Sequence, residues 1–286
     1  MKLTALMENA SIRPDCCAEH GLSVLIGTER HTVLFDAGAS ANFARNAEAL
    51  GIDLRRVEAA VLSHGHNDHS GGMIEFFRLN ATASLYVRDS FDLKHFNRKG
   101  KDISIAPELS ASPRIVRVST ERLELNEQMT IVHWGGQPGV RAIDTCGMTA
   151  ETAPGSALTP EQFDHEQYLL VAEGEKRVLL TGCSHRGILN IMHWARSEGV
   201  QTVIGGFHFK DVPESEYESR LSDAAAELKK YPVTYYSCHC TGDAPLPTLK
   251  SGWAASCKAS TPGRRSCCRD AFSQRSLRSP ISASCV

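Results

Sequence analysis

The residues with the clearest chemical potential lie in one short stretch, residues 63–72, which reads Ser-His-Gly-His-Asn-Asp-His-Ser-Gly-Gly. Three imidazoles and one carboxylate, those of His64, His66, Asp68 and His69, fall within this stretch. Imidazole nitrogens and carboxylate oxygens are ligands of zinc and related ions, and a metal centre needs several of them on a rigid support. The spacing therefore indicates a metal centre rather than a polar turn with scattered histidines.

The segments on either side of this stretch fit that role. Residues 59–62 form a short apolar run, which predicts a buried strand that delivers the histidines to the edge of a sheet. Gly71 and Gly72 allow a sharp turn, and residues 73–77 read as the start of a helix. The motif is thus expected on a loop at a strand end.

The rest of the chain repeats this plan, in which a strand or hairpin ends in a loop carrying histidine or cysteine and a helix follows. Hairpins are predicted over 22–26 with 31–36 and over 168–172 with 177–181, further strands over 85–87, 114–118, 129–132, 202–206 and 233–237, and helices over 40–50, 188–197 and 214–230. Residues 92–112 and 135–164 read as an excursion over the site and a long cap loop. Two such halves predict an α/β architecture in which helices cover mixed sheets.

The bulk composition excludes several classes of protein. The hydrophobic share of 42% is ordinary for a soluble globular chain, and a net charge of -2 gives no sign of a nucleic-acid or membrane partner. Neither an apolar run of about 18 residues nor the apolar core of a signal peptide is found. We therefore expect a cytoplasmic protein whose ten cysteines are thiols.

The composition changes near residue 250. Residues 1–250 are expected to form one domain, whereas residues 251–286 hold nine serines, five arginines and four cysteines with Asp270 as the single acid. Few large apolar residues are present there, so this tail is predicted to be poorly ordered beyond about residue 255 and to lack a final strand. A basic nucleic-acid-binding tail and a shifted reading frame are the alternatives.

The His-x-His-x-Asp-His pattern resembles that of the metallo-β-lactamase superfamily. Residues 36–38 resemble its early Asp-x-Gly element, and residues 179–182 resemble the strand that delivers its mid-chain ligand. Residues 19–23, 181–188 and 238–242 resemble the subgroup named for 7,8-dihydropterin-6-methyl-4-(β-D-ribofuranosyl)aminobenzene 5′-phosphate synthase. The resemblance implies a four-layer αβ/βα sandwich with the metal site at one edge of its two sheets.

Two metal positions follow from this resemblance and from the ligand chemistry. We assign His185 to the first position with His64 and His66, and His239 to the second with Asp68 and His69.

Cys183 stands where many superfamily hydrolases have a bridging aspartate. A thiolate binds zinc but bridges differently, so the expectation is one or two zinc ions, with Cys183 open as a ligand. Diiron members usually carry glutamate at the position of His66, so imidazole there favours zinc, with manganese or iron as the alternatives.

Several other residues could have either a functional or a structural role. Asp68 and His208 are the candidates for catalytic roles, although His208 could equally be a structural histidine. Asp36 could orient a ligand histidine or simply form a turn. The remaining candidates are Arg186 and Lys210 as phosphate ligands or surface charges, Cys238 and Cys240 as a zinc clip or core residues, and His20, His31, His95, His133, His165 and His193 as structural or exposed histidines.

The function expected from these residues is metal-dependent hydrolysis, in which hydroxide on the metal attacks a small ester or phosphoester. The resemblance offers a transferase as an alternative, joining a pterin methyl group to an aminobenzene ribose phosphate. A non-catalytic redox sensor that uses Cys183, Cys238 and Cys240 is a third hypothesis. The partner expected is a small molecule, phosphorylated compounds included, with no nucleic acid or membrane; a homo-oligomer stays open.

Overall fold

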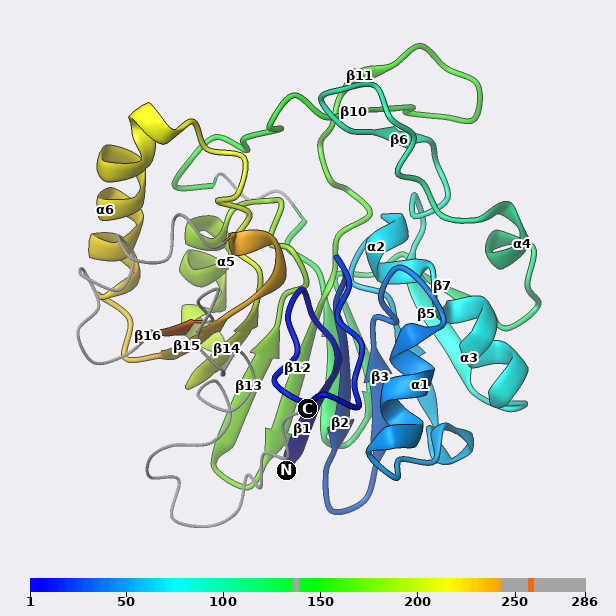
Figure 1. Cartoon of the computed structure of the whole chain (residues 1–286). Helices are drawn as coiled ribbons and strands as arrows, with labels where there is room; N and C mark the ends of the chain where they lie inside the picture. The colour runs from blue at the N-terminus through cyan, green and yellow to red at the C-terminus, as the bar shows by residue number, and fades with distance from the viewer. Residues whose placement is uncertain (136–138, 243–256, 260–286) are drawn as a thin grey trace.

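The computed structural model describes residues 1–135, 139–242 and 257–259. Two mixed β-sheets lie face to face between two layers of helices (Figure 1). The first sheet has the spatial order β1 (Lys2–Met7), β2 (Ser23–Gly27), β3 (Thr32–Phe35), β4 (Ala59–Val61), β5 (Ser84–Arg88) and β7 (Ile115–Val118). The second has the order β16 (Cys257–Ala259), β15 (Thr234–Ser237), β14 (Thr202–Gly205), β13 (Lys176–Leu180), β12 (Tyr168–Glu173), β9 (Met129–Val132) and β8 (Arg122–Asn126).

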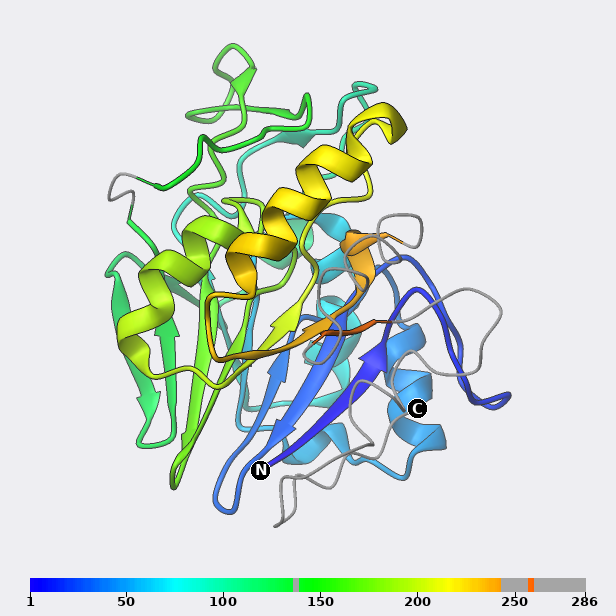
Figure 2. The ribbon, with the colours of Figure 1, turned by 90° about the vertical axis from the view of Figure 1, so that its left-hand side faces the viewer.

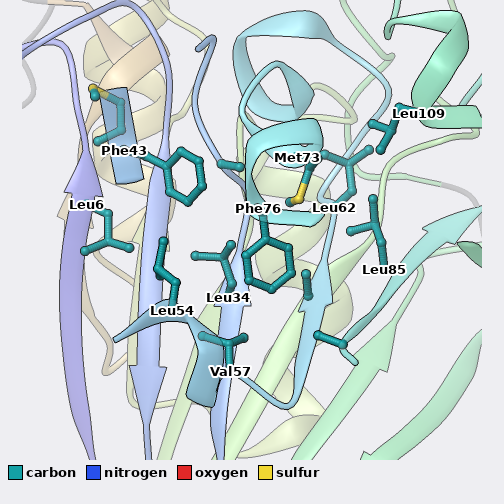
Figure 3. Close-up of a cluster of buried hydrophobic side chains, with 14 of the residues drawn as sticks. Leu6, Leu34, Phe43, Leu54, Val57, Leu62, Met73, Phe76, Leu85 and Leu109 are labelled. Atoms are coloured by element: carbon teal, nitrogen blue, oxygen red, sulfur yellow. The ribbon is translucent and has the colours of Figure 1, made fainter. Parts of the chain in front are cut away.

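Helices α1 (Asn42–Ala49) and α3 (Met73–Leu79) cover the outer face of the first sheet (Figure 1). Phe43 of α1 and Phe76 of α3 are fully buried against Leu34 of β3, in the cluster shown in Figure 3. Phe43 and Ala47 lie four positions apart and so share one face of α1. This apolar stripe is what holds the helix on the sheet.

Helices α5 (Ile188–Ala195) and α6 (Tyr217–Leu228) cover the second sheet in the same way. Ile191 of α5 and Leu221 of α6 are buried in one cluster with Leu179 of β13. The short 3-10 helices are η1 (Leu54–Arg56), η2 (Arg196–Glu198), η3 (Glu214–Glu216) and η4 (His239–Thr241).

The space between the sheets is filled by side chains that alternate with those facing the helices. Val33 and Phe35 of β3 point into this inner cluster, whereas Leu34 points to the helices. Leu169 and Val178 approach from the second sheet. The four-layer αβ/βα sandwich expected from the sequence is therefore confirmed.

Parallel strands bring the loops that matter to one edge of the molecule. β3 is parallel to β4, and β13, β14 and β15 are parallel to one another. The carboxyl ends of parallel strands meet at the same edge of a sheet. The loops that begin after Phe35, Val61, Leu180, Gly205 and Ser237 are thus presented together.

A small third sheet lies over this edge, with the order β11 (Thr159–Pro160), β10 (Thr149–Ala150) and β6 (His95–Phe96) (Figures 1 and 2). The same region includes α4 (Pro107–Ser110). Asn67, in the metal-motif helix α2 (Asn67–Ser70), donates its backbone N–H to the Ile103 carbonyl oxygen at 2.8 Å. The predicted excursion and cap loop therefore form this covering sheet and its connections, which we call the cap.

Most predicted elements are present within a few residues of the expected bounds. The sequence reading missed β1, β8 and the two-residue cap strands, because these segments carry weak alternation. The expectation that the tail lacks a final strand is wrong for residues 257–259, because β16 pairs in parallel with β15. The rest of the predicted tail, 251–256 and 260–286, and the domain boundary at 250 lie outside the described residues. Among the described helices, none has the length and apolar character needed to span a membrane.

Candidate metal centre

The six predicted ligands other than Cys183 come from three strand ends and converge. His64 and His66 follow β4, His185 follows β13, and His239 opens η4 after β15. The ring centroids of His64, His66 and His185 lie 4.6 to 4.8 Å apart. The rings of His69 and His239 lie 4.9 Å apart. The structure thus brings together residues that are up to 175 positions apart (239 − 64).

Cys183 lies between the two predicted metal positions. Potential ligand atoms within 4.8 Å of one another form the groups His64–Cys183–His185, His69–Cys183–His239 and His64–Asp68–His69. The Cys183 sulfur lies 3.2 Å from Nε2 of His69, and Asp68 Oδ2 lies 3.3 Å from Nε2 of His239. This arrangement gives Cys183 the place that a bridging ligand would need.

Asp36 fixes the orientation of two candidate ligands. Its Oδ2 atom accepts a hydrogen bond from Nδ1 of His69 at 2.7 Å and lies 2.7 Å from the Ser63 hydroxyl. That hydroxyl lies 2.8 Å from Nδ1 of His64. With Nδ1 protonated in both rings, the lone pair of each sits on Nε2, which is the atom available to a metal. Of the two roles considered for Asp36, the geometry agrees with the orienting one.

His239 is anchored in the same way from the first strand's end. Its Nδ1 lies 2.8 Å from Oδ1 of Asn9, and its backbone N–H donates to Glu8. Asn9 Oδ1 also accepts the N–H of Gly21 at 3.4 Å, which identifies this atom as an acceptor. His239 therefore presents Nε2 toward Asp68 as a lone pair.

Unpartnered nitrogen atoms mark the centre. Within the described chain, Nε2 of His64, His66 and His239 and both ring nitrogens of His185 are buried without a hydrogen-bond partner. Burying polar atoms without partners costs free energy unless something bonds to them. A divalent cation bound by these residues would satisfy them, so the donor set fits the metal that the motif implies.

The protonation states of the candidate ligand histidines agree with metal binding. Burial, with added repulsion from neighbouring histidines, lowers the pKa values of His64, His66 and His185 well below the usual range. Burial also lowers the pKa of His239 to about 3. These rings are neutral at pH 7 and keep the lone pairs that metal binding needs. Burial and the adjacent Cys240 raise the pKa of Cys183, so a cation would have to displace its proton.

Backbone geometry at the centre is unusual. Asp36, Ser184, His208 and His239 all have φ between 48° and 58°, in the left-handed region that residues other than glycine seldom adopt. Such conformations persist where the surroundings enforce them, and they gather at functional sites.

Glu166 enforces the loop that carries His185. Its two carboxylate oxygens accept the backbone N–H groups of His185 and Arg186 at 2.7 and 3.0 Å. Burial raises the pKa of Glu166 to about 7. Glu166 was missed in the sequence analysis. Its only sign in the sequence is an acidic residue just before a strand that is otherwise apolar.

A second buried group adjoins His66 and was also missed. Ligand-type atoms of His66, His95, Glu161 and His165 lie within 4.8 Å of one another, and all four residues are buried. Nδ1 of His95 lies 2.6 Å from Glu161, which leaves its Nε2 as a lone pair. Nδ1 of His165 accepts the N–H of Gly65, so its Nε2 carries the proton. This group places one buried acceptor and one buried donor beside a candidate ligand.

A cavity of about 320 Å³ opens onto the centre. Its lining includes His66, Asp68, Cys183 and His185, together with His208 and cap residues. His208 packs 4.3 Å from His185, measured between ring centroids, and its Nδ1 lies 3.6 Å from the Cys146 sulfur. Burial and the nearby Lys210 lower the pKa of His208 to about 4.

The other candidates have the following surroundings. Arg186 is buried and bonds to the Phe163 carbonyl and Asp164, which argues against a phosphate role. Lys210 and His20 both line the cavity. Cys240 donates its S–H to the Cys183 carbonyl, while Cys238 is half-buried. His31 pairs with Glu58 and Glu127, and His133 with the Glu166 carbonyl.

Replacing Asp36 with asparagine is expected to weaken metal binding by about 10–100-fold. The two carboxylate oxygens together accept hydrogen bonds from His69, the Ser63 hydroxyl and the Ser63 backbone N–H, whereas an amide has one acceptor oxygen and turns an NH₂ group toward one of these donors. Competition with a chelator measures this affinity. Asp223→Asn, an exposed position on α6 that pairs with Arg141, is the matched control. Equal affinities of the two variants would contradict the orienting role.

Comparison with known proteins shows which class the chain resembles. The family model described as metallo-beta-lactamase superfamily matches residues 18–140, which include the whole His-x-His-x-Asp-His loop. The crystal structure of Tm1679, described as a metal-dependent hydrolase of the beta-lactamase superfamily, is 26% identical to this chain. It aligns with a TM-score of 0.74 over 92% of this chain and 96% of that one. The chain is therefore similar to the metallo-beta-lactamase superfamily in sequence over residues 18–140, and it shares the fold of that superfamily over most of its length.

Individual relatives narrow the resemblance further. An uncharacterized protein of Methanocaldococcus jannaschii is 26% identical over 81% of this chain and 88% of its own length. The 7,8-dihydropterin-6-methyl-4-(beta-D-ribofuranosyl)-aminobenzene-5'-phosphate synthase of the same organism is 24% identical over 79% and 82%. The metallo-beta-lactamase fold protein YhfI from Bacillus subtilis is 13% identical, with a TM-score of 0.56 over 92% and 97%, and shares the fold.

Proposed function

We propose that this protein is a metal-dependent hydrolase that cleaves a small ester or phosphoester at the edge of the sandwich. The observation that carries the proposal is the set of buried, unpartnered imidazole nitrogens of His64, His185 and His239 beside an open cavity. One or two zinc ions are the proposed cofactor, with manganese or iron as alternatives.

The bound cation would supply Lewis acidity and would lower the pKa of a water molecule toward neutrality. His64, His66 and His185 would hold one ion, and Asp68, His69 and His239 a second, with Cys183 between them. Asp36 and Ser63 keep the ligand tautomers fixed. The roles of these residues do not depend on which of the two ions binds first.

His208 is the proposed partner of the leaving group. Its ring forms part of the cavity wall and is neutral at pH 7, because burial and Lys210 lower its pKa to about 4. A neutral imidazole offers an N–H donor to a leaving oxygen. Asp68, which also lines the cavity, is the proposed site for holding a proton or an ion next to the substrate.

The test is hydrolysis by the purified, zinc-loaded protein against a panel of carboxylic esters, phosphomonoesters and phosphodiesters. Activity that disappears on chelation and returns with added metal supports the proposal. His208→Asn is expected to lower kcat while metal content stays unchanged. Full metal occupancy with no turnover of any member of the panel argues against hydrolysis.

The alternative is a transferase like the synthase of Methanocaldococcus jannaschii, and the 24% identity over 79% of this chain favours keeping it. In that reaction an aminobenzene ribose phosphate, rather than water, would attack the methyl carbon of a pterin methyl pyrophosphate, and the carbon–oxygen bond to pyrophosphate would break as pyrophosphate leaves. Mass-spectrometric detection of a condensation product with both substrates present, and no hydrolysis of either alone, would select this function.

A protein of another class, a redox sensor without turnover, is the third proposal. The Cys240 S–H donates to the carbonyl of Cys183 at 3.4 Å, so two buried thiols adjoin the centre. This hypothesis expects metal release on treatment with hydrogen peroxide and no activity against either panel.

A further inference from the structure

The mouth of the cavity carries an excess of positive charge. Four of its lining residues are cationic, and these are Arg98, Lys99, Lys101 and Lys210. The acids in the same lining are Asp68 and Asp211. Since Asp68 lies in the candidate metal centre, the cations have little counter-charge at the mouth itself.

Three of these cations belong to the cap, and within the described residues one of the three has an ion pair. Arg98 lies 3.4 Å from Asp211, and Lys94, which is outside the cavity lining, pairs with Asp102 at 2.9 Å. Lys99 and Lys101 have no ion pair within the described part of the chain. A surface lysine without a partner is common, so their placement has to be judged from the turn that carries them.

That turn is held in a defined shape by Asn97. Oδ1 of Asn97 accepts the backbone N–H groups of Lys99 and Lys101 at 2.9 and 3.1 Å. The Asn97 backbone N–H donates to the Lys101 carbonyl at 3.0 Å, and Gly100 takes the left-handed conformation that closes the turn. Both lysines are therefore carried by a built loop that borders the cavity.

Packing fixes this turn against the opposite side of the cap. A Cβ atom placed on Gly147 would lie only 3.1 Å from Cβ of Arg98, so the two segments touch closely there. Gly147 also has φ of 74°, where side chains are strained. The turn is thus attached both to the metal-motif helix, through Ile103, and to the segment that includes Cys146.

The fourth cation is fixed beside the candidate ligands. Nζ of Lys210 lies 3.1 Å from Nε2 of His20, and that nitrogen lies 3.3 Å from Oδ2 of Asp68. Lys210 thus stands one imidazole away from the metal centre, whereas Lys99 and Lys101 lie on the exposed cap turn that lines the same cavity.

We propose that the substrate carries a phosphate-type oxyanion group, and that Lys99 and Lys101 bind this group at the mouth while Lys210 faces the reacting end. The proposal deepens the hydrolase function and rests on it. Ammonium groups bind phosphate as point charges through charge-assisted hydrogen bonds. A cavity of about 320 Å³ suits a small phosphorylated metabolite, near the lower bound of ligand pockets.

The experiment measures binding rather than turnover. Inorganic pyrophosphate is titrated calorimetrically into the zinc-loaded protein, and malonate is titrated in parallel to separate phosphate from carboxylate recognition. The Lys99→Ala/Lys101→Ala double variant is expected to bind pyrophosphate at least about 10-fold more weakly than the parent protein. Lys94→Ala is the matched control, since it removes a paired lysine of the same segment, and is expected to stay within about 2-fold.

Lys210→Met is the second variant, with metal content measured alongside. We expect weaker pyrophosphate binding with unchanged zinc content, which a folding defect would not produce. Equal pyrophosphate affinity of the Lys99→Ala/Lys101→Ala and Lys94→Ala proteins would overturn the proposal. Stronger binding of malonate than of pyrophosphate would do so as well. Absence of turnover with every ester, with the lysine effect intact, would refute the hydrolase function alone.

Discussion

His64→Ala and His239→Ala proteins are expected to lose bound zinc and, with it, all metal-dependent turnover. Each substitution removes an anchored imidazole whose free Nε2 points into the centre. Loss of an orienting partner alone costs about 10–100-fold in metal affinity, so loss of a ligand should exceed that range. Elemental analysis after dialysis gives the zinc content per chain, and chelator competition gives the affinity.

The matched control for these variants is His133→Ala. His133 is also buried, but its Nδ1 lies 2.8 Å from the Glu166 carbonyl and it belongs to no ligand group. The His133→Ala protein should therefore be less stable than the parent protein but should keep its zinc. Full zinc content in either the His64→Ala or the His239→Ala protein would show that the ligand assignment is wrong. Comparing the two variants also counts metals, because they belong to different predicted positions.

The metal-free protein is expected to lose stability steeply as the pH falls below about 6.5. Histidines with depressed pKa values in the folded state bind protons more readily once the chain unfolds. Their contribution to stability is therefore present above the ordinary histidine pKa and is lost as the pH falls toward the folded value. Burial lowers the pKa of His133 to about 4 and that of His239 to about 3, and that of His185 lies well below 6.5.

Each such histidine adds up to about 1.4 kcal/mol per pH unit to the slope, so several together should lower the free energy of unfolding by a few kcal/mol per unit. Urea denaturation of the chelated protein between pH 7.5 and 5 measures this, those pH values being about the limits of the useful window. Glu166 opposes the trend, because its pKa of about 7 gives stability that is lost as the pH rises through that value.

Two single variants test which residues cause the free energy of unfolding to fall with pH. His133→Gln is expected to make it shallower, since one depressed histidine is gone. His31→Gln is expected to leave the acid loss as steep or steeper, because the hydrogen bond with Glu58 raises the pKa of His31 and so stabilises the folded state at low pH. A free energy of unfolding that does not change between pH 7 and 5.5 would contradict the buried, neutral state of these rings.

The fold was predictable from the sequence because its signals are local and redundant. Apolar runs such as residues 59–62 and 177–181 leave few choices other than buried strands, and the glycine-rich ends mark where they stop. The cap strands were not predictable in the same way. β6 and β10 are two residues long, and their pairing depends on contacts between segments more than 50 positions apart, such as Phe96 with Thr149.

The candidate site was predictable to the extent that its residues belong to a compact motif or sit at glycine-marked strand ends. His185 follows such an end after Gly182, whereas His239 lies at a strand end that is followed by Gly242. His95, Glu161 and His165 could not be found, because each stands alone in a segment of weak pattern and gains its meaning from burial beside His66. Lys99 and Lys101 could not be singled out for the same reason, since only the Asn97 turn places them at the cavity.

The distribution of the candidate ligands has a consequence for how the molecule comes apart. His64 and His69 belong to the end of the first sheet, whereas His185 and His239 belong to the second, so an ion shared among them would act as a cross-link between the two halves of the sandwich. It closes chain loops of 121 (185 − 64) and 170 (239 − 69) residues, which is a large constraint on the unfolded chain. Such an ion would bind only the assembled state, and mass action would then favour that state. Holding the sheets in register and assembling the reactive site would thus be the same event.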